Sequence, residues 1–132
     1  MIAIYANMHS NSEKISFPNG RDLGDKSCAL FEIMGKVSPY TDKPLFLCTD
    51  FIETSVMGWE QELPVLRRVV LIRRKEGDGA RIQQIPKKML WVPTNRNVVE
   101  EIRLYLTDEK GNLAPFEECD VSCTLVCIPR LN

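Results

Sequence analysis

Short apolar runs alternate with turn-forming residues along the whole chain. The two most apolar stretches, Leu45–Cys48 and Val65–Ile72, are joined by a polar segment that contains Gly58 and Pro64. The second stretch is continuous and β-branched at its centre, which is typical of a strand covered on both faces. We therefore expect two buried strands on which the others pack, and we expect the second of them to extend to Lys75.

The same pattern predicts strands on both sides of this pair. They cover Met1–Tyr5, Ile15–Phe17, Cys28–Met34, Ala80–Ile85, Met89–Val92, Val98–Thr107 and Val121–Ile128. Alternation is clearest after Val98, where Ile102, Leu104 and Leu106 share one face. Turn chemistry separates these runs: a Pro18-Asn19-Gly20 triplet, a Gly35 that ends its run, and an Asp78-Gly79 hairpin dipeptide.

Two segments stay ambiguous from the sequence. The run from Cys28 to Met34 is compatible with a helix or a strand, because a short apolar run alone does not distinguish them, and we favour a strand that ends at Gly35. Asp50 to Met57 fits a helix capped by Thr49 or Asp50, or an extended or irregular segment. The second interpretation is favoured because Gly58 and Pro64 leave little room for a helix of normal length. About eight short strands with no long helix predict an all-β sandwich or barrel, formed as one domain over residues 1–132.

Composition limits the classes of protein that fit. The chain has 132 residues, 44% of them hydrophobic and 27% charged, with a net charge of −1. This balance is globular and argues against a general nucleic-acid binder, because such proteins are usually basic. The chain lacks an apolar run of the roughly 20 residues that span a bilayer and a signal-peptide pattern at its start. We therefore expect no membrane partner, an intracellular location and five free cysteines.

The candidate catalytic and metal-binding patterns are weak. Cys119, Cys123 and Cys127 recur every four residues, which places them on one face of a strand. A zinc site would need a tight Cys-x-x-Cys pair or histidines, and the one histidine, His9, is far away in sequence, so buried apolar cysteines are the favoured interpretation. Adjacent acids such as Glu100 and Glu101 point to opposite faces of a strand. We predict no enzyme activity, no catalytic residue, no metal, no cofactor and no small-molecule substrate.

Charge is distributed unevenly. The segment from Pro64 to Lys88 contains eight basic residues and two acidic ones, whereas acidic residues outnumber basic ones from Val99 to Asp120. Such a split lets copies of one domain contact each other head to tail, although solvated strand faces would show it too. The predicted contact joins the basic strand of one copy to an acidic turn of the next: Arg67, Arg68, Arg73, Arg74 and Lys75 against Asp108 and Glu109. Trp59 and Trp91 fit a core or an interface equally well.

Three segments also carry a family resemblance. They are ANMHSNSEKISFPNG near the start, FLCTDFIETSVMGWEQELPVLRRV in the middle, and VPTNRNVVEEIRLYLTDEKGNLAPFE near the end. Together they resemble the small jelly-roll penton, or minor capsid, proteins of Polinton/Maverick-type elements and adintovirus-like viruses, and related uncharacterised invertebrate proteins. The chain departs from that pattern between Met34 and Leu45, where it is shorter.

The resemblance implies a single jelly-roll-like antiparallel β-sandwich that forms a ring, with five copies as the expected number, at a capsid vertex. It implies self-association, a major capsid protein as a second partner, and a place in the virion. The alternative is a small β-sandwich interaction module whose basic strand binds an acidic protein or a nucleic acid, of which nucleic acid is the less expected partner.

Overall fold

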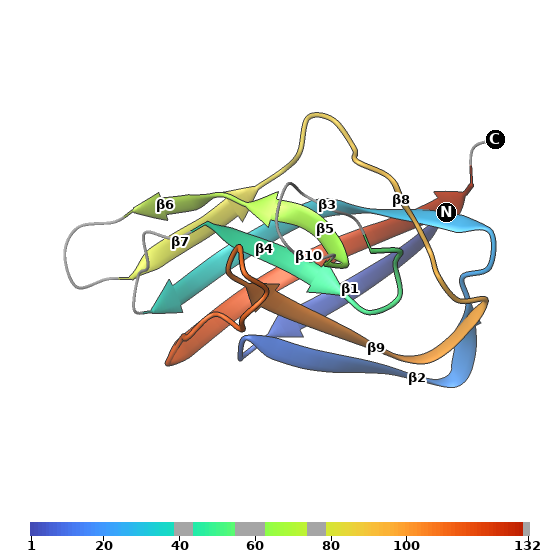
Figure 1. Ribbon diagram of the computed structural model, residues 1–132, viewed down its shortest axis with the longest axis horizontal. Helices are drawn as coiled ribbons and strands as arrows, with labels where there is room; N and C mark the ends of the chain where they lie inside the picture. The colour runs from blue at the N-terminus through green and yellow to red at the C-terminus, as the bar shows by residue number, and fades with distance from the viewer. Residues whose placement is uncertain (39–43, 55–62, 74–78, 131–132) are drawn as a thin grey trace.

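Every regular element in the described part of the protein is a β-strand. A computed structural model describes residues 1–38, 44–54, 63–73 and 79–130 (Figure 1). The strands are β1 (Ile2–Met8), β2 (Ser12–Asp22), β3 (Lys26–Ser38), β4 (Leu45–Thr49), β5 (Val65–Val69), β6 (Leu71–Arg73), β7 (Ala80–Gln84), β8 (Val92–Pro93), β9 (Val98–Thr107) and β10 (Glu118–Pro129).

The strands form two antiparallel sheets that pack face to face. Sheet A has the order β1-β10-β3-β7-β6, and the short β8 also pairs with β3. Sheet B has the order β2-β9-β4-β5. The apolar side chains between the sheets form one large core cluster to which nearly every strand contributes. This confirms the predicted all-β sandwich.

The strand order is that of a jelly roll. Without the short β6 and β8, the remaining eight strands pair as β1 with β10, β2 with β9, β3 with β7 and β4 with β5. These pairs follow one another as a single antiparallel ribbon. Rolling that ribbon up brings β10 beside β3 and β9 beside β4, which closes the two four-stranded sheets. The described residues thus form ten strands, against about eight predicted, and the eight longer ones make up the jelly roll.

The strand predicted over Val65–Lys75 is wrong as a single element. β5 ends at Val69 in sheet B, and after Val70 the chain enters sheet A as β6. The backbone N–H of Val70 donates to Gln84 Oε1 at 3.1 Å, so it leaves the ladder of sheet B. Val70 and Ile72 are about half exposed, at 52% and 45%. The continuous apolar run therefore marks a change of sheet, not a strand covered on both faces.

Two predicted strand ends are also wrong. β3 passes through Gly35 and continues to Ser38, and the Pro18-Asn19-Gly20 triplet lies inside β2. There the register with β9 shifts between Ser16 and Arg21, so the triplet forms an irregularity within an edge strand. Gly35 has φ 151°, and a Cβ on it would lie 2.1 Å from the carbonyl oxygen of Asp120. Glycine is therefore required for β10 to approach β3 this closely.

The two ends of the sandwich carry different connections. We call the tip the end with residues 9–11 and 108–117. We call the base the opposite end, which carries the start of β1, the end of β10 and residues 23–25, 50–54 and 94–97 (Figure 1, right). Residues 50–54 are irregular except for an isolated bridge between Ile52 and Thr94, in agreement with the favoured interpretation, and residues 55–57 of that predicted segment lie outside the described residues.

Candidate functional site

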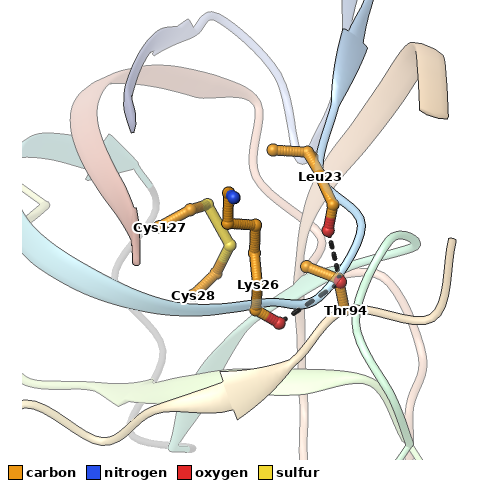
Figure 2. Close-up of a disulfide and its surroundings, with 5 residues drawn as sticks. All are labelled: Leu23, Lys26, Cys28, Thr94 and Cys127. Atoms are coloured by element: carbon orange, nitrogen blue, oxygen red, sulfur yellow. Dashed lines mark hydrogen bonds between the residues drawn. A yellow bond between two sulfur atoms is a disulfide. The ribbon is translucent and has the colours of Figure 1, made fainter. Parts of the chain in front are cut away.

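Two of the five cysteines form a disulfide, which corrects the expectation that all are free. Cys28 on β3 and Cys127 on β10 are direct partners in the register, with Cα atoms 4.2 Å apart, and their sulfurs are bonded (Figure 2). The link joins residues that are 99 positions apart in the sequence. Sequence spacing could not predict it, because only the pairing of the third strand with the last brings these two side chains together.

The disulfide lies beside a hydrogen-bonded junction at the base. The hydroxyl of Thr94 donates to the carbonyl oxygens of Leu23 at 2.7 Å and Lys26 at 3.3 Å (Figure 2). Arg130 donates to the Thr94 carbonyl at 3.0 Å. Asp50 forms a second group of polar contacts at the base, since its carboxylate accepts a hydrogen bond from the backbone N–H of Arg103 at 3.0 Å and lies 3.6 Å from the Arg96 guanidinium. Together they fix the base loops against one another.

The remaining cysteines are buried free thiols. Cys119 and Cys123 point into the core from β10, as predicted, and Cys48 lies on β4. Burial raises the pKa of Cys48 and of Cys119 to about 11 and that of Cys123 to about 12. A raised pKa means little thiolate at neutral pH, so these groups are unsuited to nucleophilic chemistry as they stand.

The predicted basic residues lie at the free edge of sheet B and at its continuation into sheet A. Arg67 and Arg68 are on β5, and Arg68 is exposed. Arg67 Nη1 donates to the Lys88 carbonyl oxygen at 2.9 Å, which holds residues 87–88 beside β5. Arg73 is the last residue of β6, whereas Arg74 and Lys75 lie outside the described residues.

The predicted acidic residues lie at the tip. Asp108 caps its own turn, because its carboxylate accepts from the backbone N–H groups of Lys110 at 2.9 Å and Asn112 at 3.0 Å. Glu109 is exposed in that turn. Asp108 therefore shapes the turn, and Glu109 is the side chain that faces solvent.

The basic and acidic residues share one sheet. Arg68 pairs with Phe46 on β4, and Phe46 pairs with Thr107 on β9, directly before Asp108. Neighbouring strands are about 4.8 Å apart, so the backbones of Arg68 and Thr107 are separated by roughly 10 Å. Arg68 and the 108–109 turn therefore lie near each other at the tip of sheet B, whereas Arg73 and Arg81 lie on β6 and β7 in sheet A.

A shallow depression on the outer face of sheet A is a second candidate site. It has a volume of about 310 Å³ and is lined by Met34, Gly35, Lys36, Arg81, Gln83 and Asp120. Lys36 faces Asp120 on one side and Arg81 on the other, so three charged side chains share one row across β10, β3 and β7. No pattern in the sequence predicts this row, since it joins residues from three distant segments.

Comparison with known proteins gives no match. No family model, no curated protein and no solved structure matches the chain.

Two further properties complete the description. Within the described residues, no group of three or more His, Cys, Asp or Glu side chains is placed to hold a metal ion. In the same part of the chain, no helix is long and apolar enough to cross a membrane. Of the two tryptophans, Trp91 is partly exposed, and Trp59 lies outside the described residues.

Proposed function

We propose that the protein is a structural capsid protein, a single jelly roll that self-associates into a ring, with five copies as the expected number, at a capsid vertex. The observation that carries the proposal is the jelly-roll strand order, β1-β10-β3-β7 facing β2-β9-β4-β5. This double-sheet architecture recurs in viral capsid domains. The same architecture also occurs in proteins with other functions, so the proposal rests in addition on the sequence resemblance to jelly-roll penton proteins.

The charge arrangement supports a head-to-tail ring contact. In a closed ring each subunit presents two different surfaces to its two neighbours, and these surfaces converge toward the ring axis. Arg68 and Glu109 are both exposed, and their segments lie close together near the tip of sheet B. The proposal therefore places the tip near the axis, with β5 of one copy against the 108–109 turn of the next.

Charge reversal tests the ring contact. We expect Arg68→Glu to reduce the ring to smaller species at low salt, and Glu109→Arg to do the same. Combining both changes in one chain restores an attractive pair between neighbours and should restore the ring. The measurement is solution mass by light scattering after size exclusion, at low and high salt, because screening weakens exposed charge pairs.

Arg21→Glu is the matched control for this test. Arg21 is an exposed arginine at the other edge of sheet B, on β2, and its guanidinium lies 5.5 Å from the centre of the Phe17 ring. Its reversal should leave the ring mass unchanged. A ring that persists in both single variants would refute the predicted contact. A wild-type chain that is monomeric at all salt concentrations would show that it forms no ring in the absence of the rest of the shell.

A basic interaction module is the second candidate function. The Arg67–Lys88 hydrogen bond favours it, because it gathers Arg67, Arg68, Lys87 and Lys88 along one edge of the sandwich. Such an edge suits an acidic protein or a nucleic acid. If the partner is a nucleic acid, its affinity should fall steeply with salt, with a slope set by the number of phosphates contacted. A protein that stays monomeric and binds in this way would favour the module over the ring.

A further inference from the structure

Four strands end the two sheets, and three of them carry features that prevent pairing with another chain. β1 and β6 end sheet A, and β2 and β5 end sheet B. Natural proteins protect exposed sheet edges with charged residues, proline, bulges or very short strands. Each of these devices is found on an edge of this sandwich, but they are distributed unequally.

The protected edges are β2, β5 and β6. β2 contains Pro18, positive-φ Gly20, a register irregularity and four charged residues, Glu13, Lys14, Arg21 and Asp22. β5 follows Pro64 and carries Arg67 and Arg68 side by side. In the described part of the chain, β6 covers three residues, Leu71–Arg73, and ends in an arginine. Antiparallel pairing of β5 with its own copy would bring arginines together, and the proline and irregularity of β2 interrupt the row of backbone groups that a second strand would bond.

β1 has none of these features. Its sequence, IAIYANM, contains no charge, no proline and no glycine over seven residues, and its register with β10 is regular from Ile2 to Met8. β10 covers one side of the strand, and no strand of the described residues pairs with its other side, which we call its open edge. Tyr5 on the outer face is 75% exposed, although large aromatic side chains contribute most when they are buried.

We propose that β1 pairs with β1 of a second copy of this chain, in antiparallel register about a two-fold axis near Tyr5. Sheet A then continues from one copy into the other. The occupant is a second copy because β1 is self-complementary under this symmetry. Ile4 would face Ala6 of its partner and Ile2 would face Met8, so the inner row stays apolar across the axis.

The outer row is also compatible with this symmetry. Tyr5 would face its own copy, and Ala3 would face Asn7, which leaves no like charges opposite each other. Asn7 is already held by the Ser122 hydroxyl, which donates to its Oδ1 at 2.9 Å. The side chain next to Tyr5 is thus fixed before pairing, which lowers the entropy lost on association.

The contact is separate from the proposed ring and does not depend on it. β1 lies beside β2 at one side of the sandwich, whereas Arg68 lies on β5 at the opposite edge of sheet B. Changes at Tyr5 leave the charged residues of the ring contact in place. Loss of the dimer and loss of the ring can therefore be told apart by which variant abolishes which species.

The test places a charge on the two-fold axis. Sedimentation velocity of the wild-type chain should show a dimer, or an even multiple of the ring mass, that depends on concentration. Tyr5→Lys should weaken this dimer at least about tenfold, because it sets like charges opposite each other on a sheet edge. Tyr5→Glu should have the same effect, and an equimolar mixture of the two variants should dimerise again, because Lys then faces Glu.

Phe31→Lys is the matched control. Phe31 is a 49% exposed aromatic on β3, away from the open edge. It should leave the dimer intact if edge pairing is the contact. Equal loss with Phe31→Lys would show stacking of sheet faces instead and would overturn the proposal. A wild-type chain that never dimerises, or a mixture of Tyr5→Lys and Tyr5→Glu that stays apart, would overturn it too.

Discussion

Removing the disulfide is the sharpest test of this fold. Cys28 and Cys127 are both fully buried, and their bond ties the third strand to the last across 99 positions of sequence. Reduction breaks the bond and leaves all other side chains in place. The folded state should change little, because backbone pairing of β3 with β10 extends from Lys26 to Ser38. Most of the effect should then fall on the unfolded chain.

The size of the effect follows from the length of the closed loop. In the chain-entropy model, a loop of about 100 residues restricts the unfolded state by about 4.7 kcal/mol at 25 °C. An unfolding entropy of about 2.1 cal/mol/K per residue converts that into a thermal midpoint lower by roughly 15 °C for a chain of this length. Such a loss is a large fraction of the stability of an ordinary domain.

Urea unfolding of oxidised and reduced protein, followed by tryptophan fluorescence, measures this difference. The double variant Cys28→Ala/Cys127→Ala is the control, since its stability should not respond to reductant. Alkylation of unfolded, unreduced protein should label three cysteines, Cys48, Cys119 and Cys123. Labelling of all five after purification under oxidising conditions, or an unchanged midpoint on reduction, would refute the assignment.

Three further predictions test the packing. Gly35→Ala should lower the free energy of unfolding in urea by more than about 3 kcal/mol, because the added Cβ would meet the Asp120 backbone. Gly20→Ala is the control: the nearest atom is a Val98 methyl at 3.2 Å, so only its positive φ should cost about 1–2 kcal/mol. Equal costs for the two variants would contradict this prediction. Thr94→Val should cost about 1–2 kcal/mol by thermal unfolding through loss of its bonds at the base, and no change would mean that water replaces the hydroxyl. The three free thiols, Cys48, Cys119 and Cys123, have pKa values raised from 9.0 to about 11–12 in the folded state, which stabilises the protein below pH 9. This contribution is lost as pH rises through the folded-state values, so the urea midpoint of the wild type should fall at alkaline pH. The midpoint should fall less in a variant that replaces these three cysteines with alanine.

Local sequence patterns predicted those strands whose burial in the sandwich matches their own alternation of apolar and polar residues. The alternation in Val98–Thr107 predicted β9 with its bounds, because one face of that strand packs on the core and the other meets solvent. The spacing of Cys119, Cys123 and Cys127 predicted three side chains on one buried face. Turn residues were a poorer guide, because the Pro18-Asn19-Gly20 triplet and Gly35 both lie inside strands.

The candidate sites were less accessible from the sequence. The basic and acidic segments were visible as composition, but only the pairing of β5 with β4 and of β4 with β9 brings Arg68 within two strands of the 108–109 turn. The row formed by Asp120, Lys36 and Arg81 gave no sequence signal, because its members come from three strands brought together by rolling of the ribbon.

The sequence by itself determined that this chain forms β-strands with an apolar face and that these faces must be covered in a sandwich or a barrel. Periodicity and turn chemistry depend on residues a few positions apart, so they can be recognised in a short stretch of sequence. Only the tertiary structure decided which strands pair, that Val70 marks a change of sheet, that Cys28 meets Cys127, and that β1 is left with an open edge. These outcomes depend on contacts between distant segments, whose register no local pattern specifies.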